Sequence, residues 1–379
     1  MHELLPKNPF VVGKYVSDHY FCDRKNETDF LLKQIHNGRN VALIAPRRMG
    51  KSDLIHHFFN LPEIKDQYHV FFVDIYATTS FPEFVYALGK EIYEQLKPKS
   101  TAWKERFFQI IASLRMGFKL DNVTGAPTFD LGLGDIQSPQ TTLDEIFTYI
   151  DEADKPCIIA IDEFQQIGEY AEQNVEALLR TKIQRCQRAQ FIFSGSKHHM
   201  MSNMFNSSSK PFYQSAISMG LNPIPVATYS DFAISLFEED SKHLEPAVVQ
   251  NIWQQYSGFT WFVQMMMNEL YALTPQNGTC QEGMIAEAKR NVIMAQENSY
   301  RNLLSNLAPR QKVILQAIAK EGIARNITSA DFIKKYNLSS ASSVQAAVKN
   351  LLKEDIITQE DSTYRVYDFF FSEWLATVY

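Results

Sequence analysis

The stretch Ala45-Pro46-Arg47-Arg48-Met49-Gly50-Lys51-Ser52 decides the fold of this chain. It follows four apolar residues, 41–44, whose length and composition indicate a short buried strand. It precedes residues 53–59, whose apolar positions recur at helical spacing. A strand, a tight loop ending in Gly-Lys-Ser and a helix are the context of a phosphate-binding P-loop, so the stretch predicts one.

Each part of the predicted P-loop has a physical role. Gly50 lets the backbone approach a phosphate without a Cβ in the way. The N–H groups of Gly50, Lys51 and Ser52 would point into one concavity at a helix N-terminus, where the dipole favours anions. Lys51 would reach the β/γ-phosphates, and the Ser52 hydroxyl would bind Mg²⁺. The residues expected to bind ATP are Ala45, which replaces the usual first glycine, Pro46, Arg47, Arg48, Met49, Gly50, Lys51, Ser52 and Asp53.

A second signal is a pair of acids after a later apolar run. Residues 157–161 indicate a buried strand, which ends in Asp162 and Glu163. Asp162 would hold the Mg²⁺ through water or Ser52. Glu163 would polarise the water that attacks the γ-phosphate. Another strand-like segment, 68–75, falls between the two motifs in sequence. This segment and the glutamate next to the aspartate together favour the additional-strand class of P-loop NTPases over a kinase or GTPase layout.

Two further segments have candidate roles at the nucleotide. Residues 190–196 predict a strand that runs into a polar tip, where Ser194 or Ser196 would sense the γ-phosphate or simply form a turn. Residues 174–188 predict a helix. It carries Arg180, Arg185 and Arg188, which would complete a neighbour's site or remain surface charges.

The remaining core pattern is that of an α/β domain. Helices are expected over 84–96, 101–114 and 141–150, a β-hairpin over 116–133 and a last strand over 216–221. The Ser- and Asn-rich segment 200–210 is expected to be mobile. Before the P-loop, an aromatic segment from residue 8 to 23 and a helix to about His36 would cover the core as a strap, wall the adenine, or both.

The sequence predicts three domains, with the first boundary at the Pro-rich residues 222–225. They are a P-loop core with an N-terminal strap (1–224), a helical lid (225–300) and a winged-helix domain of three helices and a β-wing (301–379). A turn at 256–262 would bring the lid onto the nucleotide base, and it contains no arginine. The last domain has ten Lys/Arg and eight Asp/Glu, a weak excess that fits protein contacts at least as well as DNA.

Bulk composition narrows the class of protein. The chain has 379 residues, 45% of them hydrophobic and 21% charged, which is ordinary for a globular protein. With a net charge of −6, the protein as a whole has no positive electrostatic potential that would attract nucleic acid. Four widely spaced cysteines indicate reduced thiols. With no secretory signal pattern and no run long enough to span a bilayer, we expect a cytoplasmic location and no membrane partner.

These motifs resemble those of the archaeal-type ATPases, on the STAND and origin-recognition-related side of the AAA+ superfamily, which also occur in bacteria. The resemblance rests on residues 21–27, the P-loop, 159–164, 193–196, the Gly258 turn and the winged helix. It implies a five-stranded parallel core, a helical lid, ATP and Mg²⁺ as cofactors, and nucleotide-controlled switching or assembly. It also implies that Arg24 lies near the adenine. Thr260 departs from the family, because signalling members commonly carry a proline there.

Three functional hypotheses follow. The first is an ATPase switch with slow hydrolysis, in which the winged helix reports the nucleotide state to a protein partner or to a second copy. The second is a DNA-binding initiator or regulator that uses ATP as a structural or assembly ligand. The third is a nucleotide-binding adaptor that never hydrolyses ATP.

Overall fold

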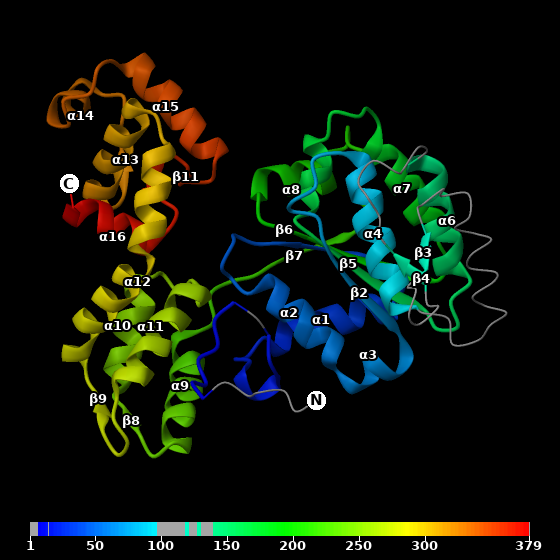
Figure 1. Ribbon diagram of the computed structural model, residues 1–379, viewed down its shortest axis with the longest axis horizontal. Helices are drawn as coiled ribbons and strands as arrows, with labels where there is room; N and C mark the ends of the chain where they lie inside the picture. The colour runs from blue at the N-terminus through cyan, green and yellow to red at the C-terminus, as the bar shows by residue number, and fades with distance from the viewer. Residues whose placement is uncertain (1–6, 14, 97–117, 121–126, 130–138, 379) are drawn as a thin grey trace. The chain divides into compact units, whose positions relative to one another are not determined.

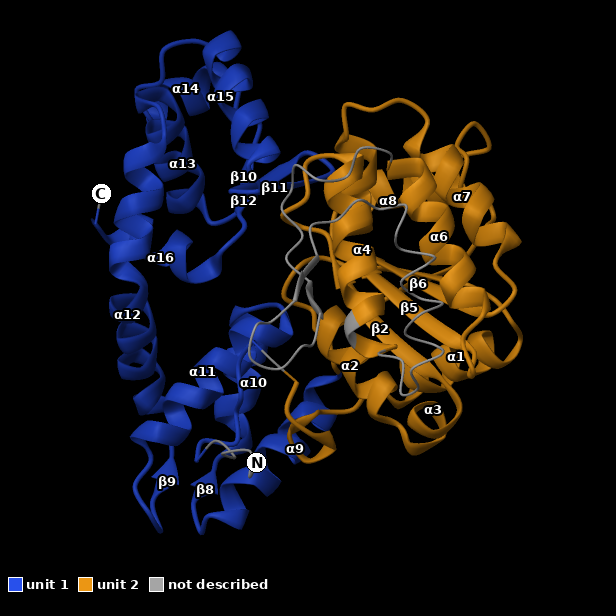
Figure 2. Ribbon diagram, turned by 45° about the vertical axis from the view of Figure 1, so that its right-hand side comes forward, with its two compact units in different colours: residues 1–13, 225–379 blue, residues 14–224 orange. Residues whose placement is uncertain are grey.

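The computed structural model describes residues 7–13, 15–96, 118–120, 127–129 and 139–378. By its internal contacts the chain forms two units (Figure 2). One unit, which we call the core unit, comprises residues 14–224. The other, the helical unit, comprises residues 1–13 and 225–379, so it holds the lid, the winged helix and the start of the chain. The composition of the chain predicts that this first segment belongs with the core, in a domain of residues 1–224.

A five-stranded parallel sheet forms the centre of the core unit (Figure 1). The strand order is β2-β5-β6-β1-β7, and every neighbouring pair runs parallel. All strands therefore end at the same edge of the sheet. The strands are β1 (Val41–Ile44), β2 (His69–Asp74), β5 (Cys157–Asp162), β6 (Ala189–Gly195) and β7 (Ile217–Gly220).

The strand that separates the P-loop strand from the acidic strand is β6, which pairs with both β1 and β5. The segment 68–75, which sequence order had suggested for the additional strand, forms β2 at the edge of the sheet. Chain order alone does not determine spatial order in a parallel sheet, because each crossover helix can carry the chain past a neighbouring strand.

Helices cover both faces of the sheet (Figure 1). One face is covered by α1 (Lys25–His36), α2 (Lys51–Asn60) and α3 (Pro62–Gln67). The other is covered by α4 (Phe81–Gln95), α6 (Pro139–Asp151), α7 (Val175–Arg185) and α8 (His198–Asn206). With both faces covered, β1 and β5 are buried along their whole length, which explains why they are continuous apolar runs rather than alternating patterns.

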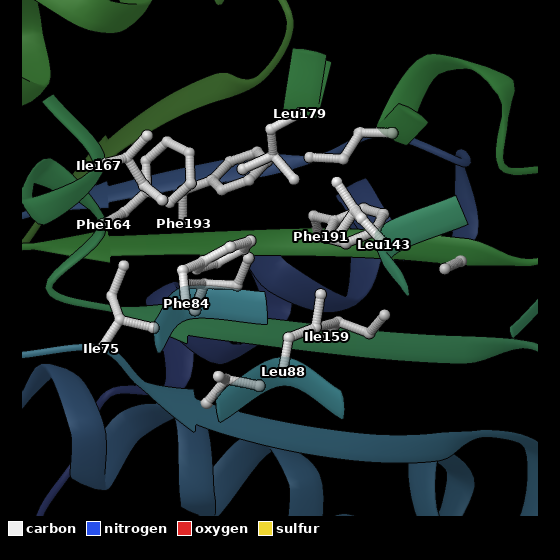
Figure 3. Close-up of a cluster of buried hydrophobic side chains, with 14 of the residues drawn as sticks. Ile75, Phe84, Leu88, Leu143, Ile159, Phe164, Ile167, Leu179, Phe191 and Phe193 are labelled. Carbon is white, nitrogen blue, oxygen red and sulfur yellow. The ribbon is translucent and has the colours of Figure 1, made fainter. Parts of the chain in front are cut away.

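A cluster of buried apolar side chains lies between the sheet and the second set of helices (Figure 3). Its centre is aromatic. The ring of Phe193 lies 4.5 Å from that of Phe164, 5.2 Å from Phe205 and 5.6 Å from Phe212, centroid to centroid. These four rings come from β6, the turn after β5, α8 and the segment after α8. Their packing therefore holds α8 and the segment after it against the ends of β5 and β6.

Two local predictions were wrong. No helix was predicted for the Ser- and Asn-rich residues 200–210, but most of them lie in α8, because Met201, Met204 and Phe205 form a buried face at helical spacing. The helix predicted to Arg188 ends at Arg185. Arg188 instead precedes β6 and donates to the carbonyl oxygens of Ala153 and Asp154, at 2.9 and 3.1 Å.

The predicted hairpin is confirmed where it is described: β3 (Phe118–Leu120) and β4 (Pro127–Phe129) pair antiparallel. The helix expected over 101–114 lies outside the described residues.

In the helical unit, the lid consists of helices with a small parallel pair of strands. The helices are α9 (Val226–Glu239), α10 (Pro246–Gln255), α11 (Thr260–Leu273) and the long α12 (Ile285–Asn306), and the strands are β8 (His243–Leu244) and β9 (Thr279–Cys280). None of the helices built from described residues is long and apolar enough to cross a membrane.

The N-terminal strap is anchored in the lid. Phe10 is fully buried, with its ring 5.6 Å from that of Phe237 and 5.8 Å from that of Tyr271. Asn268 donates to the Phe10 carbonyl oxygen at 2.8 Å, and Asn8 donates to the Asn268 carbonyl oxygen at 2.8 Å. A buried ring and two amide hydrogen bonds hold residues 7–13 in the helical unit.

The C-terminal part of the helical unit is a winged helix. Its helices are α13 (Pro309–Glu321), α14 (Ala330–Lys335), α15 (Ala341–Lys353) and α16 (Phe369–Val378). Its three-stranded antiparallel sheet has the order β10-β12-β11, formed by Ala324–Arg325, Thr363–Val366 and Ile357–Glu360. Ser329 and Ser340 accept hydrogen bonds from backbone N–H groups at the starts of α14 and α15, as N-cap residues do.

We expect Phe193→Ala to lower the free energy of unfolding of the core unit by about 3–5 kcal/mol, because it empties the centre of the aromatic core. Urea unfolding followed by circular dichroism measures this loss. Tyr213→Ala is the control, since Tyr213 is 38% exposed and its removal opens no buried cavity. Equal losses in the two variants would show that the ring is not central to the core.

Candidate functional site

The P-loop joins β1 to α2, and its backbone has the conformation that a phosphate cradle requires. Gly50 is the N-cap residue of α2 and has a φ of +86°. This left-handed conformation is accessible to glycine and strained for a residue with a Cβ. Arg48, two residues earlier, also has a positive φ, of +69°. The first intrahelical hydrogen bond runs from the N–H group of Leu54 to the carbonyl oxygen of Gly50, so the backbone N–H groups of residues 51–53 have no partner within the helix.

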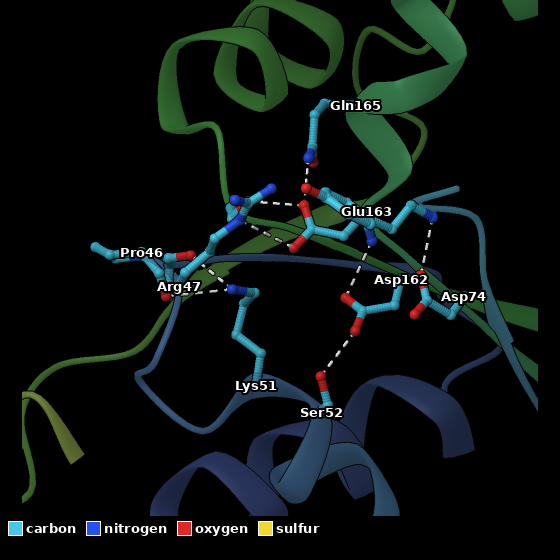
Figure 4. Close-up of polar contacts among 11 residues, drawn as sticks. Pro46, Arg47, Lys51, Ser52, Asp74, Asp162, Glu163 and Gln165 are labelled. Atoms are coloured by element: carbon cyan, nitrogen blue, oxygen red, sulfur yellow. Dashed lines mark hydrogen bonds and ion pairs between the residues drawn. The ribbon is translucent and has the colours of Figure 1, made fainter. Parts of the chain in front are cut away.

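Lys51 lies at the first position of α2 and is only 6% exposed. Its ammonium group donates to the carbonyl oxygens of Ala45 and Pro46, at 2.9 and 3.2 Å (Figure 4). Burial lowers the pKa of Lys51 and Arg47 lowers it further, whereas the carboxylates of Glu163 and Asp162 raise it. The ammonium group is therefore folded over the P-loop within electrostatic range of both acids.

Ser52 connects the P-loop helix to the acidic strand. Its hydroxyl donates to Asp162 Oδ2 at 2.7 Å, across from the end of β5 (Figure 4). The other oxygen of Asp162 accepts a hydrogen bond of 3.0 Å from the N–H group of Glu163. A serine hydroxyl and an aspartate carboxylate are hard oxygen donors of the kind that Mg²⁺ prefers, so this pair fits a magnesium ion.

Glu163 begins the turn after β5 with a left-handed backbone, φ +56°. A residue other than glycine in this region is strained unless its surroundings hold it there. Ser196 donates to its Oε2 at 2.7 Å, and the side-chain amide of Gln165 donates to the same oxygen. Arg47 Nε lies 3.7 Å from Oε1 (Figure 4). The carboxylate is thus held in place by partners from three segments.

The two candidate serines have different surroundings. Ser194 is fully buried in β6 opposite Leu43, and its hydroxyl has no hydrogen-bond partner among the described residues. Ser196 follows the end of β6 and contacts Glu163. Between them, Gly195 permits a close approach: a Cβ there would lie 2.5 Å from Gln165 Oε1 and from Met201 Sδ. Only Ser196 therefore reaches the acids at the edge of the sheet.

Arg24 is 3% exposed and lies at the start of α1. Its guanidinium group donates to the carbonyl oxygen of Met49 in the P-loop at 3.1 Å and to that of Asn222 at 2.7 Å. It also pairs with Glu27 at 2.8 Å. This arginine ties the segment ahead of the core, the P-loop and the end of the sheet together.

Asp74 joins the acids at the strand ends, and the sequence analysis did not single it out. It is the last residue of β2 and lies in register with Asp162. Partial burial raises the pKa of Asp74, and the charges of Asp162 and Glu163 raise it further. Its position directly after the apolar run 70–73 could have indicated a site residue. Parallel strands all end at the same edge of the sheet, where ligands bind.

The other candidates are less central. Asp53, in the first turn of α2, has its pKa raised by burial and interacts electrostatically with His56. Arg188 is bound to backbone carbonyl oxygens near the start of β5, the opposite end of that strand from the acids. Arg180 lies within α7 and Arg185 at its last position.

A P-loop with a buried lysine, a serine bound to an aspartate across the sheet, a neighbouring glutamate and an intervening parallel strand together define a P-loop ATPase core. Family models agree. The chain belongs to the family described as "ATPase domain predominantly from Archaea", whose model matches residues 21–265. A second model, a probable winged helix domain, matches residues 298–377. No curated protein matches the chain by sequence.

Solved structures with the same fold cover nearly the whole chain. The Walker-type ATPase paby2304 of Pyrococcus abyssi has a TM-score of 0.64 and 18% identity, covering 97% of this chain and 99% of that one. The ORC2 protein of Aeropyrum pernix, in ADPNP–ADP complexes, has a TM-score of 0.59 and 13% identity over 97% and 95%. The ORC1 protein of the same organism, in complex with DNA, has a TM-score of 0.54 and 11% identity over 94% and 92%. At these identities the similarity establishes the fold alone.

We expect Arg24→Ala to lower the free energy of unfolding by about 2–4 kcal/mol, since it leaves the buried carbonyl oxygen of Met49 and the partly buried one of Asn222 without their donor. ATP affinity should fall as well, because the P-loop loses its support at Met49. Urea unfolding and nucleotide titration of the same variant measure the two effects. Arg39→Ala, at an exposed arginine of the same unit, is the control. An Arg24→Ala variant as stable as the control would contradict the assigned role.

Proposed function

We propose that this protein is a nucleotide-controlled ATPase switch that binds ATP with Mg²⁺, hydrolyses it slowly and signals its state through the winged helix. The observation that carries the proposal is the meeting of two motifs at one edge of the sheet. Lys51 and Ser52 of the P-loop lie within electrostatic and hydrogen-bond reach of Asp162 and Glu163. This pairing of a phosphate cradle with two acids is what ATP hydrolysis requires.

The residues of the P-loop have distinct tasks in binding. The start of α2 offers backbone N–H groups and a positive dipole end to the β- and γ-phosphates. Lys51 exchanges the carbonyl oxygens of Ala45 and Pro46 for phosphate oxygens, which are better partners for an ammonium group because they are charged. When bound, Mg²⁺ supplies positive charge between the phosphates, and Ser52 and Asp162 would hold it.

Glu163 is the residue we assign to the hydrolytic step. A water oxygen attacks the γ-phosphorus, the bond from that phosphorus to the bridging oxygen breaks, and ADP leaves with the electron pair. Glu163 accepts the proton that the water loses and returns it to the released phosphate. Its carboxylate is already engaged by Ser196, Gln165 and Arg47, so it must change partners before it can act. This requirement supports a slow turnover.

The winged helix is coupled to the lid through aromatic packing. Tyr256, fully buried beside the Gly258 turn, lies 5.1 Å from the ring of Phe370 in α16. Phe262 lies 4.9 Å from Phe369, and the guanidinium group of Arg365 lies 5.5 Å from the ring of Phe259. A lid that moves with the nucleotide state would therefore carry the winged helix with it.

We expect Lys51→Ala to abolish nucleotide binding. Glu163→Gln should retain nucleotide binding and lower the rate of phosphate release about a hundredfold or more, because it removes only the proton acceptor. Titration with a fluorescent ATP analogue and a steady-state phosphate assay measure the two effects. Equal ATP affinity in wild type and Lys51→Ala would refute the proposal. Wild-type phosphate release no faster than that of Glu163→Gln would favour the adaptor that never hydrolyses.

DNA binding remains the second candidate for the output, and one solved relative, the ORC1 protein, is in complex with DNA. The charges of this winged helix favour a protein partner. The wing tip carries exposed Glu360 and Asp361, which would repel a phosphate backbone. The exposed face of α15 has only Lys349 and Lys353 as basic residues.

We expect Lys349→Gln with Lys353→Gln to leave duplex-DNA affinity within about twofold of wild type at every salt concentration, since two lysines opposite an acidic wing form no phosphate-binding surface. Fluorescence anisotropy on a labelled duplex between low and physiological salt tests this. A strong, salt-dependent affinity that disappears in the double variant would establish the DNA-binding alternative.

A further inference from the structure

Arg47 occupies an unusual position in the P-loop, between an acid and an aromatic ring. Its Nε lies 3.7 Å from Glu163 Oε1, and its guanidinium carbon lies 5.0 Å from the centre of the Tyr76 ring. Figure 4 shows the arginine reaching from the loop over Lys51 to the carboxylate. The side chain thus connects the phosphate-binding loop directly with the residue that we assign to water activation.

The pair between Arg47 and Glu163 is weak enough to be exchanged. Its separation of 3.7 Å is longer than a charge-assisted hydrogen bond, and the arginine side chain is 28% exposed. Partly exposed pairs of this geometry contribute little to stability. A terminal phosphate carries more charge than a carboxylate and matches the planar fork of a guanidinium group, so it competes well for this arginine.

Arg47 also passes close to Lys51, as the labelled side chains in Figure 4 show. Two cations held near each other are each stabilised by an anion placed between them. Glu163 serves Arg47 in this way, while Lys51 is bound to neutral carbonyl oxygens. A triphosphate, with several charged oxygens, would satisfy both cations at once.

The opposite oxygen of Glu163 is fixed independently of the arginine. Oε2 accepts hydrogen bonds from Ser196, at 2.7 Å, and from Gln165, which is 1% exposed. If Arg47 left, these two donors would keep the carboxylate in position, and Oε1 would become available to another partner. A water molecule is the natural one, since a carboxylate oxygen accepts its hydrogen.

We propose that Arg47 is the γ-phosphate sensor of this protein: ATP draws its guanidinium group from Glu163 to the terminal phosphate, and this exchange frees Glu163 to receive the attacking water. ADP, without that phosphate, leaves Arg47 on Glu163. The inference deepens the proposed function and rests on it. The lid turn at 256–260 has no arginine. In its place, the P-loop would supply the cation that senses the γ-phosphate.

The first test compares triphosphate with diphosphate binding. Arg47→Met keeps most of the stem and removes the charge, so it should weaken a non-hydrolysable ATP analogue about tenfold or more and change ADP affinity less than about twofold. Isothermal titration with both nucleotides measures the ratio. Arg39→Met, a matched exposed arginine in the same unit, should change neither, and an unchanged thermal midpoint in all variants excludes a folding defect.

A double-mutant cycle tests the exchange itself. Glu163→Gln removes the competitor for Arg47, so it should tighten the ATP analogue several-fold when Arg47 is present and leave it unchanged in the Arg47→Met background. Equal loss of ADP and ATP-analogue affinity in Arg47→Met would overturn the proposal. The same gain from Glu163→Gln in both backgrounds would also overturn it. Either result would leave the ATPase function standing, whereas ATP binding by Lys51→Ala would remove that function.

Discussion

The hydrogen bond between Ser52 and Asp162 joins two parts of the chain that are 110 residues apart in sequence. It is formed only because β1 and β5 run parallel with β6 between them, so that the P-loop and the acidic strand end at the same edge. A reversal of either strand would move one motif to the far side of the sheet. The site therefore depends on sheet topology before it depends on any single side chain.

Charge balance is the second constraint on this edge. Asp162 and Asp74 end two adjacent strands and Glu163 follows Asp162, so the charges of Asp162 and Glu163 raise the pKa of Asp74. Lys51 and Arg47 offset them from the P-loop. Lys51 is bound to backbone carbonyl oxygens, and Arg47 lies beside Glu163. Under the proposed function, a triphosphate would replace these internal contacts.

Much of this arrangement could be predicted from the sequence. The strand before the P-loop, the loop and the two acids were recognisable because continuous apolar runs ending in charged residues are characteristic of parallel sheets. Asp74 was missed because it lies near the other acids only through the pairing of β2 with β5, which places it beside Asp162. The sequence of neither segment shows which residues will be paired. The contact between Arg47 and Glu163 was also invisible, since two flexible side chains meet there from different elements.

The errors in local structure have a common cause. The segment 200–210 looked like a loop because serine and asparagine dominate its composition, yet three buried apolar side chains at helical spacing fix α8. Composition describes the exposed face, whereas burial decides the structure. The same holds for residues 7–13, whose place in the helical unit depends on the buried ring of Phe10 and on two amide hydrogen bonds.

The connections of the chain bear on how a nucleotide signal would leave the core unit. The helical unit contains residues 7–13 as well as residues 225–378, so the chain passes between the units twice, next to Gly13 and at Pro225. A movement of one unit against the other must be accommodated at both places, which restricts it more than a single linker would. Gly13 has a φ of +87°, a conformation that glycine adopts without strain.

Because the Gly258 turn is packed against α16, the lid and the winged helix would move together in such a restricted motion. Under the proposed function, these aromatic contacts would make the lid and the winged helix respond together to the nucleotide state.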